Sequence, residues 1–290
     1  MMASKESDLQ QVINALVSAE WLRDNLNTPN LKMIDASWFM PGSERNAKSE
    51  WMSQRIPGAV YFDFDAEIVD KSSSLPHMLP SPAQFEQAVS ALGIDNEDIV
   101  VVYDSSGIFS APRVWWMFKA MGHQSVAVLD GGFPAWISAG GEIDSELPRI
   151  PAKTQYVAEL VSERVIDKDT LLAGISSASL NVIDVRPADR FAGSVPEPRA
   201  GVRSGHMPNA KNLPFGKLLV NGKFKDKSEL ERLITPVVSA DMLNVSSCGS
   251  GVTACILSLA SEITLGKPIT VYDGSWSEWG SDATLPVVTD

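Results

Sequence analysis

The chain is poor in the residues that hold metals and form disulfides. Its 290 residues include two cysteines and three histidines. Cys248 and Cys255 lie close together in one segment, where a disulfide between them is geometrically disfavoured. This cysteine usage fits a reducing compartment. The histidines are scattered, and no Cys/His spacing typical of a metal site occurs. The sequence therefore predicts neither a metal nor another cofactor.

Long apolar runs and surplus positive charge are also missing. No apolar stretch reaches the ~20 residues that span a bilayer. Residues 1–21 lack the basic and apolar regions of a secretion signal, so we expect cytoplasmic residence. The formal net charge of −12 argues against nucleic acid or an anionic membrane as partner. For the same reason, an anionic substrate would need a local group of arginines.

The chain contains an internal repeat, in which one sequence pattern occurs twice. The apolar run 31–36 is similar to 180–185, and the segment 126–132 is similar to 269–274. Within each copy, short β-rich runs alternate with helical patterns, as at 99–103 and 112–121. This alternation predicts an α/β fold with two domains, each a parallel sheet flanked by helices. We place the boundary in a stretch rich in Gly and Pro, giving domains 1–145 and 146–290.

The strongest chemical signal is the segment 248–254. Cys248 follows an apolar run and sits on a turn with two glycines, directly before a helical pattern. Glycines let successive backbone N–H groups point inward, and a helix N-terminus adds partial positive charge. Such surroundings favour the nucleophilic thiolate. The first copy has Asp104 at this place, which predicts that only the second copy is catalytic. A packed structural thiol is the alternative reading, and the helical context favours it for Cys255.

Four strings carry a resemblance to the tandem-domain rhodaneses: residues 76–80, 110–116, 248–254 and 272–276. The four strings occur in the family's order, and the resemblance covers nearly the whole chain. The resemblance implies two rhodanese-like domains and a sulfurtransferase. Gly249, Ser250 and Gly251 are similar to the loop of family members that take sulfur from 3-mercaptopyruvate, whereas thiosulfate-using members typically carry basic residues there. The resemblance then implies a Cys248 persulfide, release of pyruvate, and transfer to cyanide or a thiol, on a small molecule or a thioredoxin-like protein.

The resemblance also implies roles for individual residues. Ser250, His77 and Asp65 match a proton relay that would act beside Cys248 across a cleft between the domains, with Asp63 as a rival to Asp65. The positions that match substrate binding are Arg190, Arg199, Gly249, Gly251, Val252 and Thr253. Guanidinium groups suit this task because they bind carboxylates bidentately.

Structural explanations that involve no function compete with these roles. Without the resemblance, the two arginines would be read as solvated surface residues and His77 as an exposed loop residue. Arg186 follows the apolar run 182–185, and we expect it to form a structural ion pair.

Three alternative functions stay open. Thiosulfate could be the main sulfur donor within the same fold. A cysteine phosphatase needs Cys-x5-Arg, but Ala254 stands at the arginine position. A non-catalytic binding module is the remote alternative, and the intact Cys248 argues against it.

Overall fold

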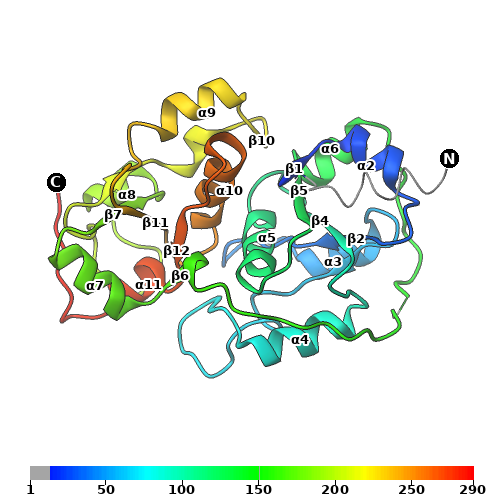
Figure 1. The fold of residues 1–290 in the computed structure, drawn as a ribbon, viewed down its shortest axis with the longest axis horizontal. Helices are drawn as coiled ribbons and strands as arrows, with labels where there is room; N and C mark the ends of the chain where they lie inside the picture. The colour runs from blue at the N-terminus through cyan, green and yellow to red at the C-terminus, as the bar shows by residue number, and fades with distance from the viewer. Residues whose placement is uncertain (1–13, 150) are drawn as a thin grey trace. The chain divides into compact units, whose positions relative to one another are not determined.

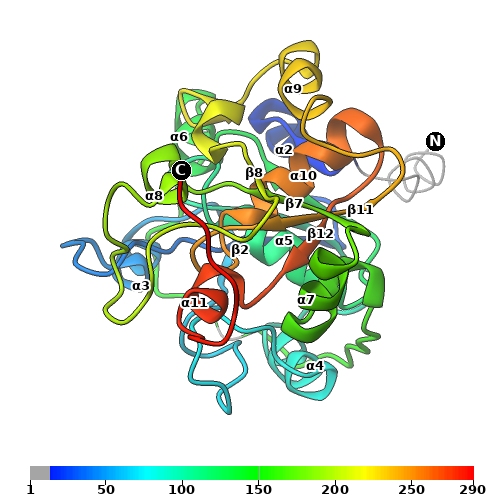
Figure 2. The same cartoon turned by 90° about the vertical axis from the view of Figure 1, so that its left-hand side faces the viewer.

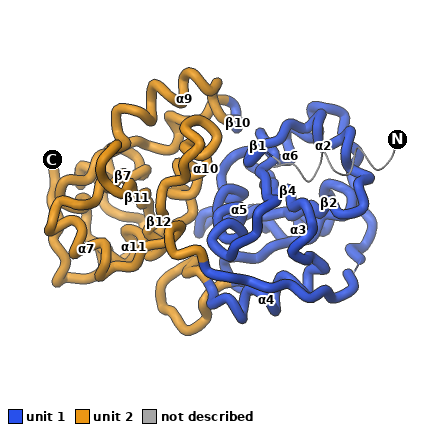
Figure 3. The backbone as a smooth tube through the Cα atoms, viewed as in Figure 1, with its two compact units in different colours: residues 1–68, 80–160, 221–223 blue, residues 69–79, 161–220, 224–290 orange. Residues whose placement is uncertain are grey.

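The chain forms two compact units (Figure 3), and the computed structural model describes residues 14–149 and 151–290. The first unit comprises residues 1–68, 80–160 and 221–223, and the second comprises 69–79, 161–220 and 224–290. Each unit therefore combines most of one sequence repeat with a short segment from the other. The boundary between residues 145 and 146 stays a prediction; the main division between the compact units falls after residue 160.

The first unit is built around a five-stranded sheet (Figure 1). Its strands are β1 (Leu16–Val17), β2 (Leu31–Asp35), β3 (Val60–Tyr61), β4 (Ile99–Tyr103) and β5 (Val126–Leu129). Its helices are α2 (Ala19–Asn25), α3 (Ala47–Ser53), α4 (Pro82–Ala91), α5 (Ala111–Ala120) and α6 (Gly132–Ser138). The strand order is β1-β5-β4-β2-β3, and every neighbouring pair is parallel.

The second unit repeats this plan (Figure 2). The strands of its sheet are β6 (Val165–Ile166), β7 (Leu180–Asp184), β8 (Lys211–Asn212), β11 (Leu243–Ser247) and β12 (Thr270–Tyr272). Two further strands, β9 (Leu219–Val220) and β10 (Lys223–Phe224), form a separate two-stranded sheet. Lys223 of β10 belongs to the first compact unit. Its α-helices are α7 (Lys168–Ser176), α8 (Ala188–Ala192), α9 (Lys227–Ile234), α10 (Ala254–Leu265) and α11 (Ser275–Trp279), and its 3-10 helices are η1 (Ser162–Arg164) and η2 (Phe215–Leu218).

The two sheets have the same topology. The second sheet runs β6-β12-β11-β7-β8, again all parallel, so each strand occupies the place of its counterpart in the first sheet. This confirms the predicted α/β fold with two parallel sheets. The central strands are buried because helices flank them: all of β4 is buried, and α5 packs against β4 and β5. Such strands read as continuous apolar runs, which is the pattern seen at 99–103.

The carboxyl ends of the central strands carry the loops of interest. In the second unit, β11 ends at Ser247 opposite Asp184 of β7. In the first unit, β4 ends at Tyr103 opposite Asp35 of β2. In parallel sheets, ligand sites form at this edge, where strands turn into helices. No helix among the described residues is long and apolar enough to cross a membrane.

Candidate active site in the second unit

Cys248 lies where the sequence predicts it, between the end of β11 and the start of α10. Its side chain is 2% exposed. The backbone around it is fixed by the first residues of α11. The Cys248 N–H donates to Ser275 Oγ (3.1 Å), and the Cys248 carbonyl accepts from the Trp276 N–H (3.0 Å). The nucleophile candidate is therefore buried in a rigid polar backbone frame.

The loop after Cys248 presents unused amide donors. Among the described residues, no acceptor takes a hydrogen bond from the N–H of Gly249, Ser250, Val252 or Thr253. Gly251 makes the turn with a left-handed φ of 78°, which is easiest for glycine. Buried amides rarely stay unpaired, so this group of donors is suited to an anion.

The carbonyls of the same loop, in contrast, have partners. The Gly249 carbonyl accepts from Ser277 N–H (2.8 Å) and Ser277 Oγ (2.6 Å). The Gly251 carbonyl accepts from Cys255 Sγ (3.2 Å). Cys255 is fully buried, in agreement with its predicted role as a packed thiol. These contacts hold the carbonyls in place and leave the amides to face a ligand.

The first unit shows what this type of loop binds. At the place of Cys248, the carboxylate of Asp104 accepts four amide hydrogen bonds, from Ser106, Phe109, Ser110 and Ala111, at 2.8–3.0 Å. Burial raises the pKa of this carboxyl, and the amide hydrogen bonds oppose that shift. The loop between β4 and α5 is thus an anion cradle filled by its own side chain.

His77 comes from the first repeat but belongs to the second compact unit, within the segment 69–79 (Figure 3). Its Nδ1 lies 3.1 Å from Ser250 Oγ and 3.2 Å from the Ser250 carbonyl. His77 is 2% exposed, and Ser250 is 7% exposed. The structure thus brings together two of the residues that the resemblance assigns to the relay, and it shows His77 buried rather than on the surface.

The two aspartate candidates lie in the first compact unit. Asp63 Oδ1 accepts from the N–H groups of Asp65 (3.2 Å) and Ala66 (2.9 Å), so this carboxylate closes its own turn. Asp65 is exposed. The choice between Asp63 and Asp65 as support for His77 stays a prediction.

Arg190 lies beside the nucleophile loop. A Cβ placed on Gly249 would be 3.4 Å from Arg190 Nη2, so the missing side chain at Gly249 makes room for this guanidinium. Arg190 Nε donates to Glu197 Oε1 (3.2 Å), and Arg190 Nη2 pairs with Glu197 Oε2. Its side chain keeps 20% exposure. Glu197 therefore holds the Arg190 guanidinium in position by binding its Nε and Nη2 donors.

Glu197 joins Arg190 to a buried ion pair. Arg186 donates to Glu197 Oε1 (2.8 Å) and to both oxygens of Asp184, with Nη2 at 2.6 Å from Oδ2. The expected structural ion pair of Arg186 is thus confirmed. Arg199 is half-buried, and within the described part of the chain it makes no hydrogen bond or ion pair. Its guanidinium is uncommitted, but no contact places it at the loop.

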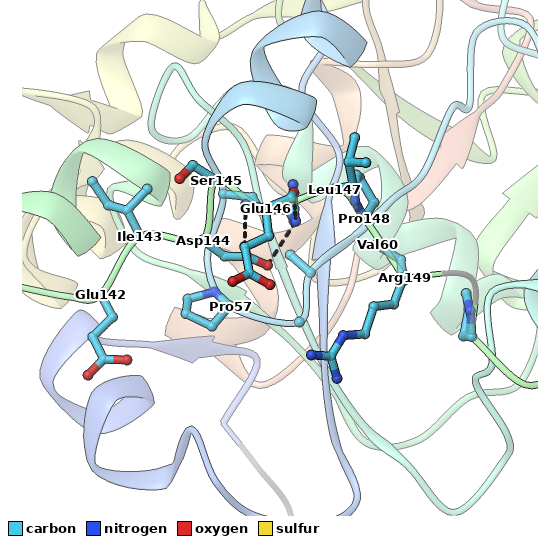
Figure 4. Close-up of a pocket in the computed structure, with 14 residues that line it drawn as sticks. Pro57, Val60, Glu142, Ile143, Asp144, Ser145, Glu146, Leu147, Pro148 and Arg149 are labelled. Carbon is cyan, nitrogen blue, oxygen red and sulfur yellow. Dashed lines mark hydrogen bonds and ion pairs between the residues drawn. The ribbon is translucent and has the colours of Figure 1, made fainter.

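A separate pocket of about 660 Å³ lies in the first unit (Figure 4). Arg55, segment 57–60 and loop 142–149, with Pro151, line it. Arg55 Nη2 is bound by Asp144 Oδ2 (2.8 Å) and the Glu146 carbonyl (2.6 Å). None of the predicted site residues lines this pocket. No three His, Cys, Asp or Glu side chains among the described residues gather as metal ligands would.

Comparison with known proteins agrees with this geometry. The family described as "Rhodanese-like domain" matches residues 18–139 and 167–282. The chain belongs to this family. A Rattus norvegicus protein named 3-mercaptopyruvate sulfurtransferase is 42% identical over 279 residues, covering 93% of this chain and 93% of that protein. The predicted membership of the tandem rhodaneses is confirmed.

Two further rhodanese relatives extend the comparison. An Arabidopsis thaliana protein named Thiosulfate/3-mercaptopyruvate sulfurtransferase 1, mitochondrial, is 40% identical, covering 94% of this chain and 77% of that protein. The crystal structure of SseA from Escherichia coli, described by its "rhodanese" fold and as a 3-mercaptopyruvate sulfotransferase, superposes with a TM-score of 0.82 at 37% identity. It covers 91% of this chain and 99% of SseA.

Sequence reasoning missed three groups that shape this rhodanese site: Glu197, Ser275 and Ser277. Ser275 and Ser277 follow the Asp-Gly pair that recurs in both copies, so the repeat itself was a signal that this turn is important. Glu197 sits between the two predicted arginines, and a carboxylate there could have been read as their partner. The side-chain pairing itself depends on tertiary contacts that no local pattern reveals.

Proposed function

We propose that this protein transfers sulfur from 3-mercaptopyruvate to a thiol or cyanide through a persulfide on Cys248. The observation that carries the proposal is that the amides of Gly249, Ser250, Val252 and Thr253 have no acceptor among the described residues and lie beside the guanidinium of Arg190. Asp104 supports it, because its carboxylate oxygens stand two bonds from Cβ, as the outer sulfur of a cysteine persulfide would. Amides arranged in this way stabilise an anion at that position without a metal.

The first half-reaction breaks the carbon–sulfur bond of the donor. The Cys248 thiolate attacks the sulfur of 3-mercaptopyruvate, a sulfur–sulfur bond forms, and the electron pair of the C–S bond passes to the pyruvate enolate. A proton is then needed at the enolate carbon. The Ser250 hydroxyl, held 3.1 Å from His77 Nδ1, is placed to deliver it, and His77 to replace it. Asp65, or its rival Asp63, would support His77.

The second half-reaction restores the thiolate. An acceptor thiolate or cyanide attacks the outer sulfur, the persulfide bond breaks, and its electron pair returns to Cys248 Sγ. The thiol acceptor is a small thiol or a thioredoxin-like protein. Arg190 and Arg199 bind the donor carboxylate, while the amides of Gly249, Val252 and Thr253, with the turn made by Gly251, receive the sulfur anion.

Thiosulfate is the second candidate donor, favoured by the double name of the Arabidopsis thaliana relative. Local charge speaks against it as the main donor. The positive charges of Arg186 and Arg190 are matched by the carboxylates of Asp184 and Glu197, and residues 249–253 carry no basic side chain. Such a site suits a monoanion better than a dianion. We also propose a cytoplasmic location. The comparisons do not establish it, because the Arabidopsis thaliana relative is named as mitochondrial.

The test combines mass spectrometry with donor kinetics. After treatment with 3-mercaptopyruvate, the peptide containing Cys248 should gain one sulfur, about 32 Da, which corresponds to a persulfide. The gain should be absent in Cys248→Ala and present in Cys255→Ala, the matched control. The value of kcat/KM should be higher for 3-mercaptopyruvate than for thiosulfate on one preparation. A sulfur gain at Cys255 alone, or none, would overturn the proposal.

A further inference from the structure

The segment that carries His77 is held to the second unit at a second point. The Leu79 N–H donates to Asp273 Oδ2 at 2.6 Å. Asp273 is 4% exposed, so this is a short, partly buried hydrogen bond to the carboxylate of a buried residue. Charge-assisted hydrogen bonds of this kind are about twice as strong as neutral ones. His77 stands two residues before Leu79, so Asp273 fixes the backbone immediately beside the imidazole.

The segment 273–277, which begins with Asp273 and continues into the first residues of α11, also holds the nucleophile loop. Ser275 Oγ accepts from Cys248 N–H (3.1 Å), the Trp276 N–H binds the Cys248 carbonyl (3.0 Å), and Ser277 binds the Gly249 carbonyl. The segment 273–277, which leads from β12 into α11, therefore contacts both the Cys248 loop and the His77 segment. Its geometry sets the distance between the nucleophile loop and the imidazole.

His77 needs such support. Its φ is 63°, in the left-handed region that is strained for a non-glycine residue. A conformation of this kind persists only when the surroundings enforce it. The contact with Ser250 restrains the ring, and the bond from Leu79 to Asp273 restrains the backbone. Without the Asp273 carboxylate, the segment can relax, and the imidazole moves away from the Ser250 hydroxyl.

We infer that Asp273 is a positioning residue for proton delivery, because it anchors the 69–79 segment and so keeps His77 against Ser250. The inference rests on the proposed function of Cys248, Ser250 and His77. Asp273 touches neither the donor nor the reacting sulfur in this scheme, and it acts through His77. The inference predicts that removal of the Asp273 carboxylate lowers kcat for 3-mercaptopyruvate and leaves donor binding unchanged.

The test compares Asp273→Ala, Asp273→Asn and a control, Asp130→Asn, which changes the equivalent aspartate of the first repeat. Asp273→Ala should lower kcat about 10- to 100-fold, the range expected when a reacting group is misplaced by about 1 Å. KM should stay within about twofold, since the arginines are untouched. Asp273→Asn keeps an acceptor oxygen for Leu79 N–H and should recover most of kcat. The control should match the wild type.

A double variant shows whether Asp273 works through His77. In a His77→Ala background, Asp273→Ala should cause no further loss of kcat, because the group that it positions is already gone. Independent effects that multiply would overturn the inference. So would an Asp273→Asn variant as slow as Asp273→Ala.

Hydrogen exchange separates this inference from the proposed function. The amides of segment 69–79 should exchange faster in Asp273→Ala than in the wild type, and at the wild-type rate in Asp130→Asn. This readout does not require activity, so a wild-type protein inactive with 3-mercaptopyruvate would refute the proposed function while exchange still tests the anchor. Unchanged exchange in both Asp273 variants would refute the anchor. If Asp273→Ala does not fold, the exchange of Asp273→Asn decides the question: its neutral acceptor binds Leu79 N–H more weakly, so the amides of segment 69–79 should exchange faster than in the wild type, and wild-type exchange in this variant would refute the anchor.

Discussion

Removal of the Asp104 carboxylate tests directly whether this type of loop binds anions. In Asp104→Ala, the amides of Ser106, Phe109, Ser110 and Ala111 lose their acceptor. Hydrogen bonds to a charged group contribute about 1.5–3 kcal/mol each, which gives a gross loss of about 6–12 kcal/mol. Relief of the buried charge offsets several kcal/mol of this. We expect a net destabilisation of about 3–5 kcal/mol, the range for breaking a buried charged interaction.

The assay is thermal unfolding with and without small carboxylates. For a unit of this size, the melting temperature should fall by about 10 °C, because each kcal/mol shifts it by about 2–4 °C. Formate fits the space that the Asp104 carboxylate vacates, so formate should raise the melting temperature of Asp104→Ala more than that of the wild type. Chloride at equal ionic strength is the control.

Two results would refute this reasoning. An Asp104→Ala protein as stable as the wild type would show that the four amides need no anion. Formate that stabilises the wild type and the variant equally would show that no cradle has been opened. Either result would also weaken the use of the first unit as a guide to the persulfide state of Cys248.

Two further predictions concern substrate capture and pH. Arg190→Ala should lower kcat/KM for 3-mercaptopyruvate by about 10- to 100-fold, and Arg199→Ala should act in the same direction; the lost charged contact costs about 1.5–3 kcal/mol. Steady-state kinetics checks this, and two variants with wild-type kcat/KM would remove the arginines from the site. Burial raises the pKa of Asp35 to about 6, so the folded state binds more protons than the unfolded state between about pH 4 and pH 6, and this group lowers stability as pH rises through that window. Asp35→Asn, which can still accept from Ser37 N–H, should therefore be more stable than the wild type at pH 8 by up to about 3 kcal/mol and equal to it near pH 4; urea unfolding at both pH values checks this, and a gain of the same size at pH 4 would contradict it.

The local features of this chain could be predicted from the sequence, because they depend on short patterns. The alternation of apolar runs with helical patterns identified the parallel sheets, and the glycines around Cys248 placed it on a turn at a strand end. The ion pair of Arg186 followed from its place after β7. The segments that the repeats exchange could not be predicted, since they depend on packing between distant parts of the chain.

Two exchanged segments illustrate this limit. Residues 221–223, from the second repeat, pack on the loop between β4 and α5 of the first unit. The approach is so close that a Cβ on Gly107 would lie 2.5 Å from the Gly222 carbonyl oxygen. The segment 69–79 occupies the corresponding place in the second unit and brings His77 to Ser250. No periodicity or composition distinguishes a loop that packs on its own repeat from one that packs on the other.

Glu197 determines how much net positive charge the candidate site offers, and it provides a last test of the donor. Its carboxylate matches the charge of Arg190 while Asp184 matches that of Arg186. Glu197→Gln keeps an acceptor oxygen and adds one net positive charge. At an effective dielectric constant of about 20 and a distance of about 10 Å, one extra unit of substrate charge gains about 1–2 kcal/mol. Thiosulfate carries one more negative charge than 3-mercaptopyruvate, so the ratio of kcat/KM for thiosulfate to that for 3-mercaptopyruvate should rise about 10-fold. The ratio should fall towards the wild-type value in high salt. A ratio that stays constant or moves towards 3-mercaptopyruvate would show that donor choice does not depend on this charge balance.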